Sequence, residues 1–482
     1  MKKLFLVICL LTLILTGCGS SDKEKAGTTE ETKESSTENP FSELDTTGFR
    51  VCYDIHMTQN LVFLPNYFGE VYGVGNKYEE AIDEWGVLNY SSAESKLLEV
   101  EQAIESADNS YYPDDIAFVK EALGLLYLDK AEYDKAYDYL IDSYVTMNEV
   151  WGEKKTTGTP EAYYPTAVSL ALCHYYYDIG DFDTCIKELQ DLKDQNTETT
   201  SVSAPMLDIQ LFVEYIMNDI EANIDKDCGR YIDAYNLYVE NSKKCSEYIK
   251  NSNDKTFGYI LMINACTQLG DICGLLSYNE EFKNSTDDFY EAALKYADKF
   301  DGELKDKYRS EILMKQGKFM FNFPEKHDQA MDIVDESIDI QERLKSEGKT
   351  SPDIINAYIT FAEVYGFVEN DTDKAQEYYG KADDIAKEIY GKNHPLTAAV
   401  YESMGRYYAN RTDDIDKAIE FYNNCVEIYK NLLVENSSKI AFIYYHLAGC
   451  YKQKGDDIKS DEYLEKANTI FDALGIELAK SN

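Results

Sequence analysis

The chain has 482 residues, of which 44% are hydrophobic and 13% aromatic, so it has ample material for a large buried core. It holds 47 Lys and Arg against 89 Asp and Glu, which gives a formal net charge of −42. Nucleic acid and anionic lipid head groups repel such a surface, so we expect neither as a partner. The acidic residues either keep a long surface soluble or form an acidic docking face, and we favour solubility.

The first residues have the layout of an export signal. Two lysines precede an apolar run of twelve residues, whereas a helix that spans a membrane needs about 20. The segment Leu15-Thr16-Gly17-Cys18 then resembles the lipobox of bacterial lipoproteins. This resemblance implies that residues 1–17 are a cleaved signal peptide and that the Cys18 sulfur carries a diacylglycerol. The alternative is an ordinary secretory signal with a chance cysteine.

A polar segment follows the proposed anchor. Residues 19–45 are rich in Ser, Thr, Glu and Lys and contain few large apolar groups, so they cannot bury enough surface to fold. We expect residues 18–45 to be a flexible tether with an end-to-end distance of roughly 30 Å. Two acyl chains on Cys18 hold a protein firmly to a membrane. The expected location is therefore the extracytoplasmic face of a bacterial cell membrane.

Nine cysteines remain after the signal peptide and Cys18. Their spacing is irregular, their number is odd and none forms a CxxC pair, which argues against a disulfide scaffold and against zinc. We expect most of them to be buried thiols that pack as small hydrophobic residues. They are Cys52, Cys173, Cys185, Cys228, Cys245, Cys266, Cys273, Cys425 and Cys450.

A repeated pattern of small and large residues runs along the body of the chain. The pattern occurs in residues 123–143, 172–192 and 447–467. In each segment a small residue is followed three positions later by Tyr and then by a turn. After the turn come a second small residue and a large residue at helical spacing. Small residues let two antiparallel helices approach closely, and neither helix buries its apolar stripe alone. The pattern resembles the tetratricopeptide repeat family. The resemblance implies an all-α solenoid of stacked antiparallel helix hairpins.

The C-terminal third carries the same pattern with longer units. Residues 361–382 and 404–425 fit with one extra turn residue. The small residues Ala330, Ala375, Ala418 and Ser460 lie 45, 43 and 42 residues apart, which is similar to the long repeats of kinesin light chains.

The organisation expected for the body is one continuous helical array. We expect tetratricopeptide-like repeats over residues 256–482, degenerate helical repeats over 46–255, and seven to nine hairpins in all. Residues 46–65 and 195–290 show too little of the motif to be assigned to particular hairpins. The pair His394-Pro395 is interpreted as a loop marker, because proline does not continue a helix.

No pattern in the sequence predicts catalysis. The five histidines are scattered, and the chain has neither an HExxH, GxSxG or Walker motif nor a Cys–His cluster. Acidic clusters at 370–373 and 412–416 lack the glycine and the last glutamate of an EF-hand loop, and acids before a helix complement its dipole. We expect a protein that is not an enzyme and that uses no cofactor or metal.

Cys173 and Cys185 occupy the two close-contact positions of one repeat, so their side chains are expected to face each other. Two alternatives remain open. A disulfide would close a short loop and contribute about 3 kcal/mol. The other alternative, which we favour, is a pair of packed thiols.

Candidate partner-binding residues follow from the family resemblance. Members of that family bind partners along a concave face lined by the first helix of each repeat, and some clamp a peptide carboxylate with Lys, Arg and Asn. The corresponding inward positions here include Glu363 and Glu402, and the candidate contacts are Asn356, Arg406, Asn410, Tyr445, Lys452 and Gln453. The alternative is that these are solvated helix faces paired with nearby acids.

The function expected from the sequence is that of a membrane-anchored extracytoplasmic scaffold. Its concave face would bind a protein or peptide through several shallow contacts. One alternative is a ligand-capture lipoprotein that presents a peptide or glycan to an uptake system. A second alternative is an enzyme with an unrecognised site, for which a deep pocket with converging polar groups would be the sign.

Overall fold

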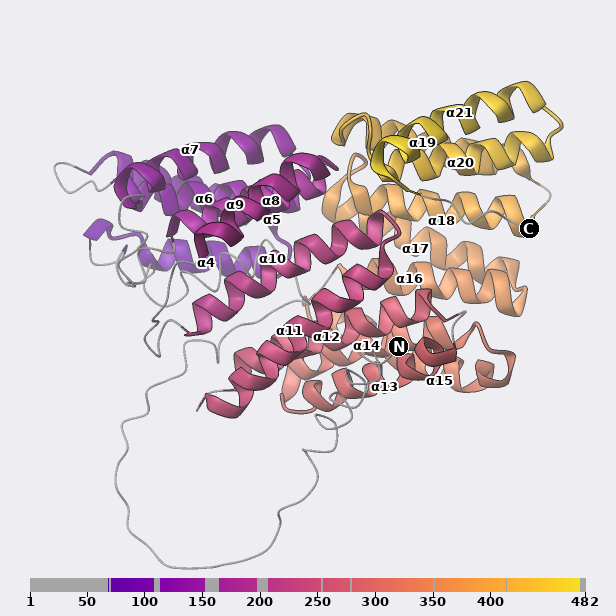
Figure 1. Ribbon diagram of the computed structural model, residues 1–482, viewed down its shortest axis with the longest axis horizontal. Coiled ribbons are helices and arrows are strands. Elements are labelled where there is room, and N and C mark those ends of the chain that lie inside the picture. The colour runs from indigo at the N-terminus through magenta and orange to yellow at the C-terminus, as the bar shows by residue number, and fades with distance from the viewer. Residues whose placement is uncertain are drawn as a thin grey trace, which may run out of the picture.

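The computed structural model describes most of the chain after residue 67. The described residues are 68, 71–107, 113–151, 164–196, 207–252, 255–277, 280–349, 352–412 and 414–476. Within them the fold is all-α, with eighteen α-helices and no strand (Figure 1). The predicted signal peptide, the tether, Cys18, Cys52 and the unassigned residues 46–65 lie outside the described residues.

The helices pair in chain order into antiparallel hairpins, nine of them in the described part. The first five are α4 (Gly75–Gly86) with α5 (Tyr90–Glu105), α6 (Pro113–Asp129) with α7 (Tyr133–Trp151), α8 (Tyr164–Asp178) with α9 (Phe182–Asn196), α10 (Leu207–Asp227) with α11 (Tyr231–Asn251), and α12 (Thr256–Leu275) with α13 (Glu280–Ala297). The last four are α14 (Gly302–Met320) with α15 (His327–Ser346), α16 (Asp353–Glu363) with α17 (Thr372–Tyr390), α18 (Pro395–Arg411) with α19 (Ile415–Leu432), and α20 (Ser438–Gln453) with α21 (Asp457–Leu474). The predicted solenoid is confirmed. The boundary at residue 255 stays a prediction, because α11 packs directly on α12 across it.

The small residues of the repeat lie at the closest helix contacts, as predicted. Ala136, Cys185 and Ala418 are fully buried within their hairpins. At Gly405 a Cβ atom would lie 2.8 Å from the ring of Tyr422 on the partner helix, so only glycine fits without displacement. This close approach is what lets large tyrosines fill the space between successive hairpins.

Three C-terminal hairpins share the same helix-capping arrangement at their turns. An aspartate caps the second helix by accepting a hydrogen bond from a lysine backbone N–H three residues later, and the ammonium of that lysine lies over a tyrosine of the first helix. The sets are Asp371, Lys374 and Tyr365; Asp414, Lys417 and Tyr408; and Asp456, Lys459 and Tyr451. The acidic clusters seen in the sequence are therefore helix caps.

An extra turn residue in the repeat is absorbed within the helix. After α16 the backbone continues as one π-helical turn, Val364–Glu369, before α17 begins. A π turn takes up the additional residue without breaking the backbone ladder. Glu363, one of the predicted inward residues, lies directly before this turn.

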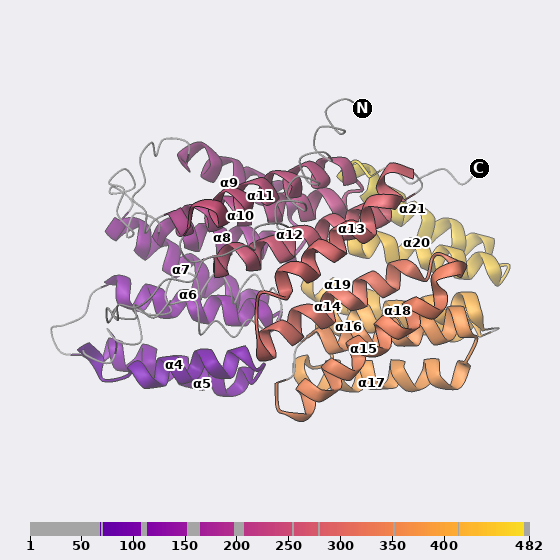
Figure 2. The same ribbon diagram turned by 90° about the horizontal axis from the view of Figure 1, so that it is seen from below.

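The array curves so that its two ends meet. Successive even-numbered helices contact one another from α6 to α20, whereas successive odd-numbered helices do not make comparable contacts, so the even-numbered helices form the inner side. Figure 1 shows the first hairpins on the left and the last hairpins on the right, joined below by α10–α15. In Figure 2 the two end stacks lie side by side.

Direct contacts hold the two ends together along a line that we call the seam. The Val434 N–H donates to the Ile179 carbonyl at 2.8 Å. Gly180 has a φ of 81°, a backbone conformation that favours glycine, and a Cβ atom there would lie 3.1 Å from Ser437. Glycine therefore suits both the backbone conformation and the close approach of the two segments. The contacting residues are more than 250 positions apart in the chain, so the solenoid closes on itself.

The core contains every described cysteine. All eight are buried and carry free thiols: Cys173, Cys185, Cys228, Cys245, Cys266, Cys273, Cys425 and Cys450. No helix in the described part combines the length and apolar character needed to cross a membrane.

Candidate functional site

The inner side of the solenoid carries a band of polar side chains on consecutive even-numbered helices, which we call the inner face. It includes cations and carboxylates in comparable number, although the chain as a whole has nearly two acids for each base. The cations are Lys226, Lys315, Lys318, Arg406 and Lys439, and the carboxylates are Asp178, Asp219, Asp227, Asp271, Glu311, Glu363 and Glu402.

The deepest part of the band surrounds Asp219 on α10. Its Oδ1 atom accepts hydrogen bonds from the Tyr238 hydroxyl at 2.8 Å and from the Asn264 side-chain amide at 3.2 Å. The same amide donates to the Tyr215 hydroxyl at 2.8 Å. Burial raises the pKa of Asp219 despite these bonds. The cluster is internally satisfied, so its role is to fix three neighbouring helices rather than to bind a partner.

Alternating charges connect the next helices. Lys226 on α10 donates to Gln268 on α12 at 2.7 Å, and burial lowers the pKa of this lysine. Asp271 on α12 accepts from Tyr290 at 2.7 Å and forms an ion pair with Lys315 on α14 at 3.0 Å. These contacts continue the band across the middle repeats, where the sequence motif is weakest.

Glu363 is the centre of the C-terminal part of the band. It lies 3.1 Å from Lys318 on α14, accepts a hydrogen bond from Ser403 at 2.7 Å and forms an ion pair with Arg406 on α18. Burial alone would raise the pKa of Glu363, but the charges of Lys318 and Arg406 outweigh it and hold this pKa below its usual value. The side chain of Arg406 keeps 45% exposure, so one side of the guanidinium still faces solvent.

The structure brings together some of the predicted contact residues. Arg406 forms an ion pair with Glu363, and the charge of Glu402 also acts on it. Burial raises the pKa of Glu402. The Asn410 side-chain amide donates a hydrogen bond to the Arg406 backbone carbonyl at 2.8 Å. The other predicted residues are exposed: Asn356, Tyr445, Lys452 and Gln453. Lys452 pairs with Asp457 at 2.7 Å at the far end of α20, away from this group.

Sequence reasoning missed Lys439, the second residue of α20. It makes no direct ion pair or hydrogen bond within the described part of the chain, but its charge acts on Asp178 of α8, Asp227 of α10 and Glu402 of α18. Lys439 therefore joins the two ends of the band across the seam. Its six-residue spacing from Tyr445 places the two residues on different sides of α20, so the periodicity of the predicted residues gave no signal for Lys439.

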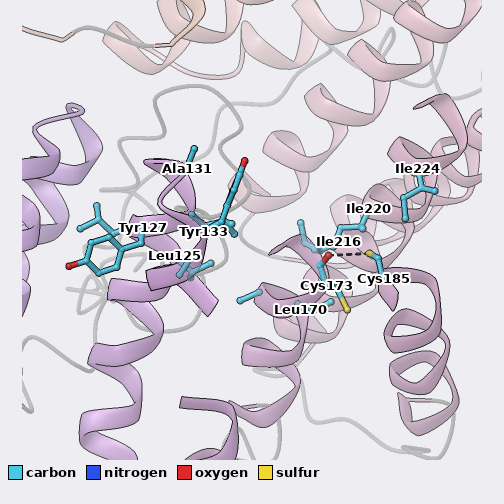
Figure 3. Close-up of a cluster of buried hydrophobic side chains, with 14 of the residues drawn as sticks. Leu125, Tyr127, Ala131, Tyr133, Leu170, Cys173, Cys185, Ile216, Ile220 and Ile224 are labelled. Atoms are coloured by element: carbon cyan, nitrogen blue, oxygen red, sulfur yellow. Dashed lines mark hydrogen bonds between the residues drawn. The ribbon is translucent and has the colours of Figure 1, made fainter. Parts of the chain in front are cut away.

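Cys173 and Cys185 lie close together across the hairpin of α8 and α9, but the Cys185 sulfur contacts the backbone of Cys173 and not its sulfur. In Figure 3 the Cys185 sulfur points at the Cys173 backbone carbonyl, with a distance of 3.1 Å. Both thiols are free in this structure. Burial raises the pKa of the Cys173 thiol to about 12, so it is a poor nucleophile at neutral pH.

Within the described residues, no cluster of His, Cys, Asp or Glu has the arrangement of a metal site. Two of the described histidines, His174 and His394, line the same space at the seam, whereas His446 lies elsewhere. His174 lies 3.6 Å from Asp178, His446 stacks on Tyr422, and His394 is buried at the seam.

Comparison with known proteins supports the repeat interpretation. Models of the tetratricopeptide repeat match residues 353–431 and 443–472, which confirms the predicted repeats in that part of the chain. The search of curated protein sequences finds no match.

Several solved structures are similar in fold at low sequence identity. The apo form of the quorum sensor NprR from B. thuringiensis is 15% identical, with 83% of this chain and 98% of that chain covered and a TM-score of 0.45. Aspartyl phosphate phosphatase F from Bacillus subtilis is 12% identical, with coverage of 85% and 97% and a TM-score of 0.45. BtubC from P. vanneervenii is 15% identical, with coverage of 52% and 93% and a TM-score of 0.39.

Proposed function

We propose that this protein is a scaffold, anchored at the extracytoplasmic face of a bacterial cell membrane through a lipid on Cys18, which binds a protein or peptide partner along its inner face. The observation that carries the proposal is the exposed group around Arg406. It combines a half-exposed guanidinium with neighbouring amides and carboxylates on consecutive helices of a rigid solenoid. Repeat proteins use such curved surfaces for extended contacts with partners.

The chemistry of this group suits a peptide. Arg406 offers donors to a backbone carbonyl or carboxylate, the exposed amides of Asn356 and Asn410 match a peptide backbone, and Tyr445 is 44% exposed and offers a flat apolar surface. Glu363 holds Arg406 in place, so little conformational freedom is lost when a partner binds. Lys452 and Gln453 extend the contact toward the end of α20.

Partner binding is tested by capture from an envelope extract of the source cell, with the full-length chain immobilised in mild detergent and bound material identified by mass spectrometry. The informative variant is Arg406→Gln. Arg343→Gln is its matched control, because Arg343 is 46% exposed and also pairs with a carboxylate, but lies on the outer helix α15. Loss of one protein or peptide with Arg406→Gln alone supports the proposal. Equal capture by both variants rejects the inner face as the binding surface.

Anchoring is tested separately with Cys18→Ala. The unchanged chain is expected in the membrane fraction as residues 18–482 with the added mass of the attached acyl groups. The variant is expected to lose that added mass and to leave the membrane fraction. Retention of the variant in the membrane with an unchanged mass would reject the lipid anchor and would leave the partner-binding test unaffected.

A further inference from the structure

A pocket of about 250 Å³ lies at the seam, where the two ends of the solenoid meet. One side is formed by the C-terminal ends of α6 and α8 and the other by the N-terminal ends of α16, α18 and α20. Its apolar and aromatic lining residues are Tyr90, Leu128, Tyr133, Pro352, Tyr390, Pro395 and Leu396. Its polar lining residues are Asp129, His174, Asp178, His394 and Lys439. The pocket is therefore mostly apolar with a few polar groups, as small-molecule sites are.

The polarity of the pocket is directional. Asp129 and Asp178 are the last residues of α6 and α8, so two carboxylates lie on one side, together with Tyr133, which begins α7. Pro395 opens α18 and Lys439 is the second residue of α20, so an ammonium lies on the other side, together with Tyr390, which ends α17. Charge changes sign across the space where a ligand would sit.

The charged groups across the pocket do not satisfy one another. Lys439 and Asp178 influence each other, yet they form no ion pair within 4 Å. Burial raises the pKa of Asp178 against the opposing charges of His174 and Lys439. His174 also has a buried Nδ1 atom without a hydrogen-bond partner in the described part of the chain. A group placed between the two sides could pair with each of them.

We propose that the seam pocket binds a free α-amino acid with an apolar or aromatic side chain. The ligand carboxylate pairs with the Lys439 ammonium, and its ammonium pairs with the Asp178 carboxylate. The neighbouring Asp129 carboxylate, whose Oδ2 accepts a hydrogen bond from the Trp85 Nε1–H at 2.7 Å, adds negative charge on the same side. The ligand side chain lies against Tyr133 and Tyr390. The volume falls just below the range of about 300–1,000 Å³ that is usual for ligand pockets, which suits a single amino acid better than a peptide.

Ligand binding in the seam pocket would also stabilise the closed form of the solenoid. Asp178 and Lys439 belong to opposite ends of the array, so a bound zwitterion links α8 to α20. Anything that binds only the closed form stabilises it by mass action. Asp178 and Lys439 belong to the inner face, but amino-acid titration needs no protein partner and the capture test uses Arg406, so each proposal can fail without the other.

The test is calorimetric titration of the full-length chain, in mild detergent, with leucine, methionine, phenylalanine and tyrosine, each followed by its N-acetyl and amide derivatives. We expect at least one amino acid to bind and to raise the melting temperature by a few degrees. Because each derivative loses one of the two charges, both are expected to bind at least about tenfold more weakly. Absence of heat with all four amino acids, or equal affinity of the derivatives, overturns the proposal.

Variants locate the site. Lys439→Met is expected to reduce affinity at least about tenfold, while Lys381→Met, an equally conservative change on the outer helix α17, leaves it unchanged. Asp178→Asn removes the opposite charge and serves as the second variant should the first fail to fold, with far-UV circular dichroism as the check. Unchanged affinity in a folded Lys439→Met or Asp178→Asn protein refutes the assignment to the seam.

Discussion

Substitution of His394 should loosen the closed solenoid and change how its stability responds to pH. His394 is the N-cap of α18 and is only 6% exposed. Its Nδ1 accepts from the Leu396 N–H at 3.1 Å, its Nε2–H donates to the Asp129 carbonyl of α6 at 3.1 Å, and its ring stacks on Tyr390 at 4.2 Å. One imidazole therefore caps a C-terminal helix and binds the end of an N-terminal one.

Two substitutions separate these roles. His394→Asn keeps a good N-cap but is too short to reach Asp129, so it loses the seam hydrogen bond and the ring stack, at a cost of about 1–3 kcal/mol. His394→Ala also loses the cap, at a further cost of about 1 kcal/mol. Both should also increase hydrogen exchange at the Val434 amide, which bonds across the same seam.

The pH dependence of the stability follows from burial of His394 as a neutral imidazole. Burial lowers the pKa of His394 to about 4. The hydrogen bond to the Asp129 carbonyl favours the charged form, but burial outweighs it. The unfolded chain, with a pKa near 6.5, takes up a proton first as pH falls. The stability that His394 contributes is therefore complete above pH 6.5 and is lost as pH falls toward 4, with about 2 kcal/mol lost between pH 7 and pH 5.

Urea unfolding followed by far-UV circular dichroism at pH 7 and pH 5 measures this effect. The carboxylates titrate in both proteins, so the difference between the unchanged chain and His394→Asn isolates the histidine. That difference should shrink by about 2 kcal/mol at the lower pH. A difference that stays constant between the two pH values would refute the neutral, buried histidine at the seam.

Three further outcomes are expected. Glu121 is buried, neither of its carboxylate oxygens has a hydrogen-bond partner in the described part of the chain, and burial raises its pKa to about 8. Glu121→Gln should therefore raise the melting temperature near pH 7.5, with a gain of up to about 4 kcal/mol. The gain should disappear toward pH 4.5, where the unfolded chain also begins to keep the proton. Gly405→Ala should destabilise by about 1–3 kcal/mol through overpacking, whereas Gly449→Ala, where nothing lies within 4 Å of the added Cβ, should stabilise slightly in the same thermal melts. Alkylation of the denatured chain without reductant should modify both Cys173 and Cys185; protection of the pair, measured by intact mass, would indicate a disulfide instead.

The hairpins could be predicted from the sequence because their determinants are local. A small residue such as Gly405 and the large residue facing it lie within one repeat, and the capping aspartates lie within one turn of the helices they begin. The same logic found the inward position of Arg406 and the mutual approach of Cys173 and Cys185.

Closure of the solenoid could not be predicted in this way. The small rotations between neighbouring repeats add up over nine hairpins, and none of them is visible in a single motif. The sequence therefore marked His394 as a loop residue, correctly placing it before α18, but did not reveal its bond to Asp129, 265 positions away. Lys439 was missed for a similar reason, because Asp178 and Asp227, two of the three carboxylates on which its charge acts, lie more than 200 positions away in the chain.

The seam also sets an order for folding. Each hairpin and its neighbour make contacts of short sequence separation, so folding can begin at any repeat and spread along the array. Contacts such as that between Val434 and Ile179 require the intervening chain to be in place first, because a loop that long is costly to close before its interior is ordered. We therefore expect closure of the solenoid to be the last event of folding.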